Sequence, residues 1–332
     1  MKFLVIGLGS MGTRRVRNLQ HLGYRDIAGF DSRSDRRENA SEKYGISTYE
    51  SFDHAIDNFS PSILIISVPP DIHCHYINLA LKLGINCFIE ASVTDHDELW
   101  RLSREVENSD LIIAPSCTMK YCLGPIKVKD LVLGGTFGKP LNFIYHTGQY
   151  LPDWHPWENI NDFYVSKRET GGCREIVPFE LVWLNDIFGY PNVISSVKSK
   201  LSDLDADIDD IYQFSLIYPK RILGLIIIDV LAKPEARREL FINLEKGQIV
   251  FSAHEKCVRY IREDDSDWSK EDLAIGTVED GYINPEEPYI NEMRDFIKAC
   301  KDSDPRQFPN TLLNDWSVLN LLSTIETVST SF

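Results

Sequence analysis

The chain has 332 residues, enough for a large hydrophobic core, and a chain of this length is more often two domains than one. Its formal net charge of -15 at pH 7 would repel a phosphate backbone over most of the surface, so we expect no nucleic-acid partner. The seven cysteines are odd in number and form no C-x-x-C pair, which predicts neither a disulfide framework nor a metal site. Without a run of about 18 apolar residues or a cleavage-type site after the N-terminus, we expect a cytoplasmic protein without membrane contact.

The first third of the chain alternates short apolar runs with longer helical patterns. The apolar runs span residues 2–7, 26–31, 63–68, 86–90 and 111–116. This alternation predicts βαβ units, and the unbroken apolar character of the runs is typical of parallel strands that helices cover on both faces. We therefore predict an α/β domain with a doubly wound parallel sheet over residues 1–121.

The second part of the chain has a different pattern. Here most of the apolar, β-branched runs follow one another without a crossover helix between them. These runs span residues 139–151, 193–203, 211–218, 221–231, 239–245 and 247–253. This pattern predicts an α+β domain over residues 122–332 with an open, largely antiparallel sheet. Helical patterns occupy residues 171–189, 289–301 and 312–328, and the acidic stretch 262–288 contains turn formers typical of a surface loop or an edge hairpin.

A nucleotide-binding fingerprint follows the first predicted strand. Gly7, Gly9 and Gly12 form G-x-G-x-x-G, with Ser10 and Met11 between the last two, at the start of a helical pattern. The first glycine permits a tight turn, the second lets the backbone approach a pyrophosphate, and the third allows close helix packing. The strand before this pattern and the helix after it favour a dinucleotide site over an ordinary tight turn.

The residues after the second predicted strand bear on the choice of cofactor. Asp31 follows Gly12 by 19 residues, the place where a carboxylate would bind ribose hydroxyls, and Ser32 and Arg33 adjoin it. Because Asp31 would repel a 2′-phosphate, we predict NAD rather than NADP. Arg33, together with the arginines at 36 and 37, weakens this choice, since a guanidinium can accept that phosphate.

With the glycine loop, the strand end ISVPPDIH (66–73) and the strand end FIEAS (88–92) in this order, the chain resembles the Gfo/Idh/MocA family, named after glucose-fructose oxidoreductase and inositol dehydrogenase. The resemblance implies an N-terminal Rossmann domain and a C-terminal domain whose sheet supports the substrate site and often a dimer or tetramer contact. It also implies cofactor contacts from these two strand ends. The matching positions are Val68, Pro69, Pro70, His73 and Glu90.

A second resemblance comes from GQYLPDWHPWENINDFY (148–164), SKRETGG (166–172) and FELVWLNDIFG (179–189). These stretches look like a subgroup of the family associated with nonulosonic-acid and surface-polysaccharide sugars. Aromatic faces stack on pyranose C–H faces while polar neighbours orient hydroxyls, so the loop is a candidate sugar site. Its candidate residues are Tyr150, Asp153, Trp154, His155 and Trp157, although for Trp157 packing on the sheet is an equal alternative.

The chain departs from the catalytic signature of this family. The family has Glu-Lys-Pro at the strand end and a His with an Asp on a later helix, whereas the matching residues here are Glu90-Ala91-Ser92, Phe179 and Val182. Both usual proton carriers are therefore absent, and a positioned base is worth about 10²- to 10⁴-fold in rate. The candidate replacements are His155, Lys120 with Tyr121, Glu180 and Glu175.

We therefore expect an NAD-dependent oxidoreductase that acts on a sugar, sugar phosphate or sugar nucleotide through a relocated acid/base group. The alternative is an NAD-binding relative that has lost dehydrogenase activity and serves as a sensor or as a partner in sugar biosynthesis. Hydride transfer in another reaction is a third option. The resemblance implies a homo-oligomer formed through the C-terminal sheet.

Overall fold

The computed structural model describes residues 1–154, 159–274, 276–279, 282 and 284–330. Contacts within the chain define two compact units. The first unit contains Met1–Thr118 and Glu286–Ser317, and the second contains Met119–Pro285 and Val318–Phe332. The units therefore differ from the two continuous domains expected from the sequence, because the chain returns to the first unit near its end.

The described part of the first unit contains a six-stranded parallel sheet in the order β3-β2-β1-β4-β5-β6. Its strands are β1 (Phe3–Ile6), β2 (Ile27–Phe30), β3 (Ser47–Tyr49), β4 (Ile63–Ile66), β5 (Asn86–Ile89) and β6 (Ile113–Pro115). The chain crosses from one side of β1 to the other between β3 and β4. In such sheets, ligands bind beyond the carboxyl ends of the strands that flank this crossing, here β1 and β4.

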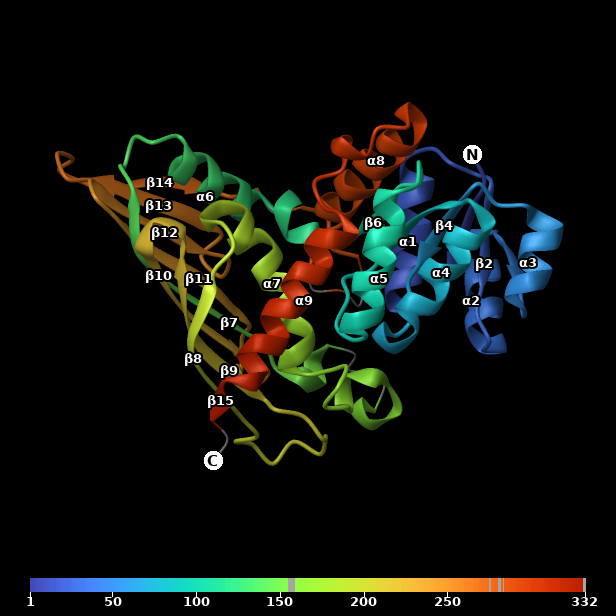
Figure 1. Ribbon diagram of the computed structural model, residues 1–332, viewed down its shortest axis with the longest axis horizontal. Coiled ribbons are helices and arrows are strands. Elements are labelled where there is room, and N and C mark those ends of the chain that lie inside the picture. Colours follow the sequence, from blue (N-terminus) through green and yellow to red (C-terminus); the bar gives the residue numbers. More distant parts are fainter. Residues whose placement is uncertain (155–158, 275, 280–281, 283, 331–332) are drawn as a thin grey trace. The chain divides into compact units, whose positions relative to one another are not determined.

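Helices cover the sheet of the first unit. They are α1 (Ser10–His21), α2 (Ser34–Tyr44), α3 (Phe52–Phe59), α4 (His73–Leu83), α5 (His96–Glu107) and α8 (Glu287–Asp302). Every residue of β1 and β4 is buried, as expected for strands covered on both faces. The returning helix α8 packs against α1, beside which it is drawn in Figure 1.

The described part of the second unit contains a nine-stranded sheet in the order β14-β13-β12-β11-β7-β10-β9-β8-β15. Its strands are β7 (Pro140–Gly148), β8 (Asn192–Ser199), β9 (Ile211–Tyr218), β10 (Ile222–Asp229), β11 (Arg237–Leu244), β12 (Gly247–Ser252), β13 (Cys257–Arg262), β14 (Ser269–Asp272) and β15 (Ser329–Thr330). Neighbouring strands are antiparallel except for the pairs β7–β10 and β8–β15. The acidic stretch that follows β13 continues into β14, an edge strand, which fits the expected edge hairpin.

The two faces of this sheet differ. Helix α6 (Leu123–Leu133) contacts β12 and β13, and helix α7 (Cys173–Phe188) contacts β9 and β10, as Figure 1 shows. On this covered face the rings of Phe143 and Phe188 stack with centroids 4.4 Å apart. On the other face one register row joins Leu225, Ile144, Phe241 and Val250 across four strands. Ile144 in this row is 43 % exposed.

The last helix, α9 (Leu312–Thr327), belongs to the first unit up to Ser317 and to the second unit from Val318 onward. The predicted fold class is confirmed: a doubly wound parallel sheet is followed by an α+β domain with a mostly antiparallel sheet. None of the helices in the described ranges is both long and apolar enough to cross a membrane.

Candidate cofactor and substrate sites

The glycine loop has the geometry that close packing at the end of β1 requires. Gly7 has φ +87°, and a Cβ on it would lie 2.4 Å from the carbonyl oxygen of Ser67 at the end of β4. A Cβ on Gly12 would lie 1.8 Å from the carbonyl oxygen of Gly7. Larger residues would therefore separate α1 from both strands. Because α1 begins at Ser10, the positive end of its dipole lies at the loop, as at phosphate-binding helix termini.

Gly9 differs from the other two glycines of the loop. The three atoms nearest to a Cβ on Gly9 would all belong to the guanidinium of Arg36, the first at 3.3 Å, and none of the three is a backbone atom. Its φ of -72° is also open to any residue. The absence of a side chain here is therefore not required by the packing of the described residues. It fits the space that a pyrophosphate needs.

The carboxylate of Asp31 is held against the loop. Asp31 is buried, and its Oδ2 accepts a hydrogen bond from the Leu8 amide at 2.8 Å while its Oδ1 accepts one from the Arg33 amide at 2.9 Å. Arg36 Nη1 lies 3.7 Å from Asp31 Oδ2. Arg33 pairs instead with Asp35, both exposed. The carboxylate of Asp31 therefore lies at the switch point of the sheet. Arg36, rather than Arg33, places its guanidinium near this carboxylate.

The ISVPPDIH turn is fixed by a buried histidine. His73 Nε2 lies 2.9 Å from the carbonyl oxygen of Val68, and burial lowers the pKa of His73, so the ring is neutral at pH 7. Nδ1 has no hydrogen-bond partner among the described residues. Val68 and Pro69 are partly or fully exposed, whereas Pro70 is buried. The turn thus offers Val68 and Pro69 to a ligand, while His73 holds the turn in shape.

Glu90, at the end of β5, is bound by an arginine that sequence reasoning did not single out. Arg15 Nε lies 2.8 Å from Glu90 Oε1 and Arg15 Nη2 lies 2.9 Å from Oε2, a bidentate pair. Arg15 Nη1 lies 3.0 Å from Oε2 of Glu292 on α8, and the side chains of Arg15 and Glu292 are both fully buried. Ser67 donates to Glu90 Oε1 at 3.3 Å. Glu90 therefore belongs to a buried ionic network.

Glu292 connects this network to the segment after β6. Beside Arg15, its carboxylate accepts hydrogen bonds from the Ser116 hydroxyl, the Cys117 amide and the Thr118 hydroxyl. Another carboxylate of the returning segment, Glu286, binds Arg14, Arg17 and Asn18 of α1. These bonds explain why Glu286–Ser317 joins the first unit. The sequence contained one signal for this network. Arg15 shares a face of α1 with the buried Leu19, and a cation on a buried face needs a partner of opposite charge.

The residues after Glu90 carry a second unexpected group. Ser92 is buried, and its amide lies 3.5 Å from Oδ1 of Asp315 on α9. Burial raises the pKa of Asp315 to about 6, although the Ser92 contacts oppose this shift. Oδ2 of Asp315 has no hydrogen-bond partner among the described residues. The strand end thus has titratable neighbours, but they lie in the protein interior.

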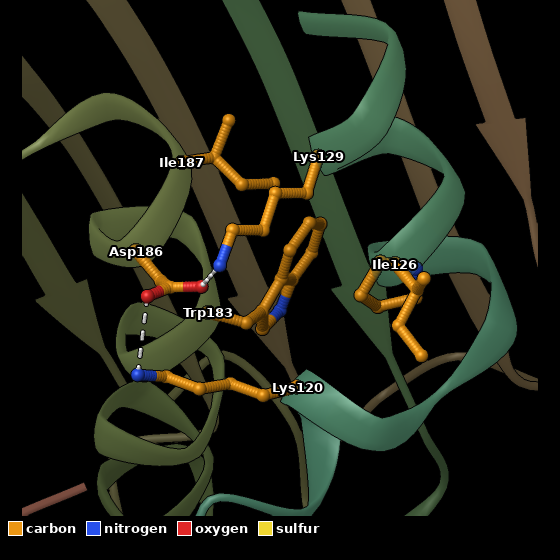
Figure 2. Close-up of a pocket in the computed structure, with 7 residues that line it drawn as sticks. Lys120, Ile126, Lys129, Trp183, Asp186 and Ile187 are labelled. Atoms are coloured by element: carbon orange, nitrogen blue, oxygen red, sulfur yellow. Dashed lines mark hydrogen bonds and ion pairs between the residues drawn. The ribbon is translucent and has the colours of Figure 1, made fainter. Parts of the chain in front are cut away.

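Lys120, a candidate proton carrier, is engaged by Asp186. Its Nζ lies 3.3 Å from Asp186 Oδ1, and the Nζ of Lys129 lies 2.7 Å from Asp186 Oδ2 (Figure 2). The cavity that these side chains line with Trp183 has a volume of about 10 Å³. This volume is room for about one water molecule, whereas small-molecule sites are commonly about 300–1,000 Å³.

Glu180, the second candidate, has no free oxygen. The side chain is fully buried. Its Oε2 accepts hydrogen bonds from the Tyr145 hydroxyl at 2.5 Å and from Trp183 Nε1 at 2.9 Å. Its Oε1 accepts two hydrogen bonds from the guanidinium of Arg238, at 2.8 and 3.1 Å. These partners come from β7, β11 and α7 itself. The arrangement anchors α7 to the sheet and favours a structural role over proton transfer.

The face of α7 that carries Phe179 has a third carboxylate. Glu175, Phe179, Val182 and Asp186 recur at helical spacing and are each partly exposed. The Tyr164 hydroxyl donates to Glu175 Oε1 at 2.7 Å, whereas Oε2 has no hydrogen-bond partner among the described residues. Burial raises the pKa of Glu175 to about 7, opposed by the bond from Tyr164.

The aromatic loop is described only in part. Tyr150 is half-buried, with Lys233 Nζ 5.0 Å from its ring centroid. Asp153 is exposed, and Trp154 is half-buried with no described hydrogen-bond partner for its Nε1. His155 and Trp157 lie outside the described residues. Among the residues that the structure describes, no group of three or more His, Cys, Asp or Glu side chains could hold a metal ion.

Comparisons with known proteins agree with this geometry. Residues 1–114 match the sequence model of a family described as "Oxidoreductase family, NAD-binding Rossmann fold", Gfo/Idh/MocA. No curated protein sequence matches the chain significantly.

Among solved structures, the chain is similar to a levoglucosan dehydrogenase in complex with NADH and levoglucosan (TM-score 0.83, 14% identity, 99% of this chain and 96% of that chain). A probable dehydrogenase from Thermotoga maritima has a TM-score of 0.80 and 19% identity, with 99% of this chain and 97% of that chain covered. The myo-inositol 2-dehydrogenase from Lactobacillus plantarum has a TM-score of 0.81 and 17% identity over 99% of this chain and 96% of that chain. Residues 1–114 thus match the NAD-binding Rossmann model of the Gfo/Idh/MocA oxidoreductase family, and nearly the whole chain has the fold of these dehydrogenases.

Proposed function

We propose that the protein is an NAD-dependent oxidoreductase that acts on a sugar, a sugar phosphate or a sugar nucleotide. The observation that carries the proposal is the glycine loop with the Asp31 carboxylate bound to the Leu8 amide at the switch point of the parallel sheet. The packing of the described residues does not require a glycine at position 9. A glycine there leaves room for a phosphate. When bound, NAD supplies the acceptor for the hydride that leaves the carbinol carbon of the substrate.

The residues proposed to hold the cofactor surround this loop. The dinucleotide would be held by Gly7, Gly9, Ser10, Met11 and Gly12, and its ribose hydroxyls by Asp31, Ser32 and Arg33. Val68 and Pro69 would line its nicotinamide half, where the buried Pro70 and His73 hold the turn in shape and Ser67 contacts Glu90. Because Asp31 repels a 2′-phosphate, NAD is preferred over NADP.

The substrate class is proposed from two sources. The similar structures carry levoglucosan and NADH, and another is a myo-inositol 2-dehydrogenase, so ring-shaped polyols are the class to test first. In this chain Tyr150, Asp153 and Trp154 offer an aromatic and polar loop, to which His155 and Trp157 belong in sequence. The finer assignment to nonulosonic-acid or surface-polysaccharide sugars rests on the stretch GQYLPDWHPWENINDFY.

The experiment that tests the proposal has two steps. NAD and NADP are each titrated into the protein by calorimetry, and NAD is expected to bind more tightly. The protein is then mixed with NAD and levoglucosan, myo-inositol, sugar phosphates or UDP-sugars, and NADH formation is followed by its absorbance, with the reverse reaction started from NADH and L-sorbose. Tighter binding of NADP contradicts the proposed preference.

A second function is favoured by a specific observation. Ala91 and Phe179 replace the proton carriers implied by the family resemblance, and Lys120 and Glu180 are both engaged by other side chains. An NAD-binding protein without turnover, acting as a sensor or partner in sugar biosynthesis, accounts for these facts. If the wild type is inactive and Ala91→Lys with Phe179→His creates activity, this second function gains, because the fold would have kept all but the carriers.

We also propose that the protein is a homo-oligomer whose subunits associate through the face of the nine-stranded sheet that α6 and α7 do not cover. The row of Leu225, Ile144, Phe241 and Val250 is apolar, and Leu223 beside it is 50 % exposed. Burial of such a row would remove apolar surface from water. Analytical ultracentrifugation of the wild type and of Phe241→Asp is expected to show an oligomer that dissociates in the variant.

A further inference from the structure

We propose that Glu175, with the hydroxyl of Tyr164 bound to it, is the proton-carrying pair of the second unit. Its carboxylate accepts the hydroxyl proton of the substrate, a task that neither Ala91 nor Phe179 can perform. The inference rests on the proposed oxidoreductase function and adds the residue that would make turnover possible.

Glu175 occupies the same face of α7 as Phe179. Glu175 lies one helical turn before Phe179, so both side chains project from the same face of the helix. That face stays partly exposed from Glu175 to Asp186, whereas Ile176, Leu181 and Trp183 are buried. Glu175 thus belongs to the face of α7 that is partly exposed.

The two carboxylate oxygens of Glu175 differ in their hydrogen bonding. Tyr164 fixes one carboxylate oxygen at 2.7 Å, and Oε2 has no hydrogen-bond partner among the described residues although it is shielded from solvent. A shielded carboxylate oxygen without a partner costs folding free energy, so its retention calls for a role. Glu180, five residues later on the same helix, shows the opposite case, because both of its oxygens have donors.

The charges around Glu175 allow it to exchange a proton near neutral pH. Burial raises the pKa of Glu175 to about 7. Tyr164, in the short helix Tyr164–Ser166, is the titratable residue that contacts its carboxylate among the described residues. The neighbouring Arg174 is turned toward Glu326 and the carbonyl oxygen of Glu169. A base with a pKa near the working pH transfers protons most efficiently.

The substrate O–H bond breaks, and its proton forms a carboxyl O–H bond at Oε2 of Glu175. The electron pair released becomes the second carbon–oxygen bond of the product carbonyl. The hydrogen on the carbinol carbon leaves with two electrons to NAD, the oxidant of the proposed function, and Tyr164 keeps its bond to Oε1 throughout.

The first experiment measures the carboxyl group itself and needs no substrate. The side-chain carboxyl carbon of Glu175, assigned by comparison of ¹³C NMR spectra of the wild type and Glu175→Gln, is titrated with pH. We expect a midpoint near 7 in the wild type and a higher midpoint in Tyr164→Phe, since the Tyr164 bond lowers the pKa. A midpoint near the ordinary 4.5 would overturn the proposal.

The second experiment uses turnover with whichever sugar of the panel the wild type oxidises. Glu175→Gln is expected to lower kcat/KM by about 10²-fold or more and to leave the affinity for NAD unchanged. The wild-type kcat/KM should rise with pH through about 7, because the base acts when ionised, and this inflection should vanish in the variant. The matched control is Glu169→Gln, an exposed carboxylate in the segment just before α7.

The outcomes separate the two claims. A wild type that binds NAD but oxidises and reduces no sugar of the panel counts against the proposed function. A wild type whose turnover and pH profile survive Glu175→Gln counts against the Glu175–Tyr164 pair alone. Circular dichroism spectra of all variants show whether each is folded, so that a loss of activity is not a loss of structure.

Discussion

The end of β5 in the first unit and helix α7 in the second unit are the two places where the family resemblance leads one to look for proton carriers. At the end of β5, Glu90 is bound at both oxygens by Arg15, which in turn binds Glu292. On α7, Glu180 is saturated in the same way by Arg238 and two neutral donors, but Glu175 has a donor at Oε1 alone among the described residues.

The difference teaches how to separate structural from functional groups in this chain. A buried carboxylate with every oxygen bound stabilises the packing around it, and breaking one partner leaves an unpaired charge. An open position, at which no contact among the described residues requires the group that is present, should tolerate a substitution with little loss of stability but at a cost to binding or turnover. Gly9 and Oε2 of Glu175 are the two examples. Substitutions of the two kinds should therefore separate in unfolding and binding measurements.

The largest expected effect concerns an open position. Gly9→Val should abolish NAD binding and leave the fold intact, because the new side chain meets the flexible guanidinium of Arg36 and fills the space for the pyrophosphate. Calorimetric titration with NAD and thermal unfolding measure the two quantities. Gly12→Val is the contrasting control: its Cβ would collide with the Gly7 carbonyl oxygen, so it should lower Tm as well. Unchanged NAD affinity in folded Gly9→Val would identify the loop as an ordinary turn.

The second effect concerns a saturated position. Arg15→Met removes the cation that Glu90 and Glu292 share, and we expect a loss of about 3–5 kcal/mol in the free energy of unfolding. Urea unfolding measures it. Arg25→Met, at an exposed arginine, should change the free energy by less than about 0.5 kcal/mol. Equal stabilities of the two variants would show that the buried network does not stabilise the first unit.

The third effect is a dependence of stability on pH. The pKa of Asp315 is raised from 3.8 to about 6 in the folded protein, so the folded state holds the proton more tightly and stability falls as pH rises across this window. Asp315→Asn has no carboxyl group to lose this proton. The free energy of unfolding of the variant should therefore rise relative to that of the wild type between pH 4 and pH 7, by at most about 3 kcal/mol, at about 1.4 kcal/mol per pKa unit. Urea unfolding at several pH values measures the difference. The exposed control Asp302→Asn should show no such growth, and a flat difference for Asp315→Asn contradicts the assigned shift.

The smallest effect concerns the choice of cofactor. Asp31→Ala should reduce the preference for NAD over NADP by roughly tenfold, about 1.4 kcal/mol, because repulsion of the 2′-phosphate is lost and Arg36 is freed from its 3.7 Å contact. Parallel titrations of NAD and NADP into both proteins measure the ratio. Asp31→Ala with Arg36→Ala should bind NADP less well than Asp31→Ala alone. A preference that Asp31→Ala leaves unchanged would assign the discrimination to another residue.

Several features follow from the order of residues alone. The unbroken apolar runs and the G-x-G-x-x-G loop predicted the parallel sheet and the place of Asp31 at the end of its second strand, because strand burial and tight turns are local properties of the chain. The runs without crossover helices likewise predicted the antiparallel sheet. That Ala91 and Phe179 stand where the family resemblance implies Lys and His stays a prediction from the sequence.

The partners of the buried charges were decided by tertiary structure. The contacts between Arg15 and Glu292, and between Ser92 and Asp315, join residues more than two hundred positions apart, and periodicity within one helix contains no information about such pairs. The same holds for the segment Glu286–Ser317, which joins the first unit because its carboxylates meet the arginines of α1. Glu175 and Glu180 look alike in sequence, and only the packing of α7 decides that Glu180 finds donors on the sheet for both oxygens while Oε2 of Glu175 has none among the described residues.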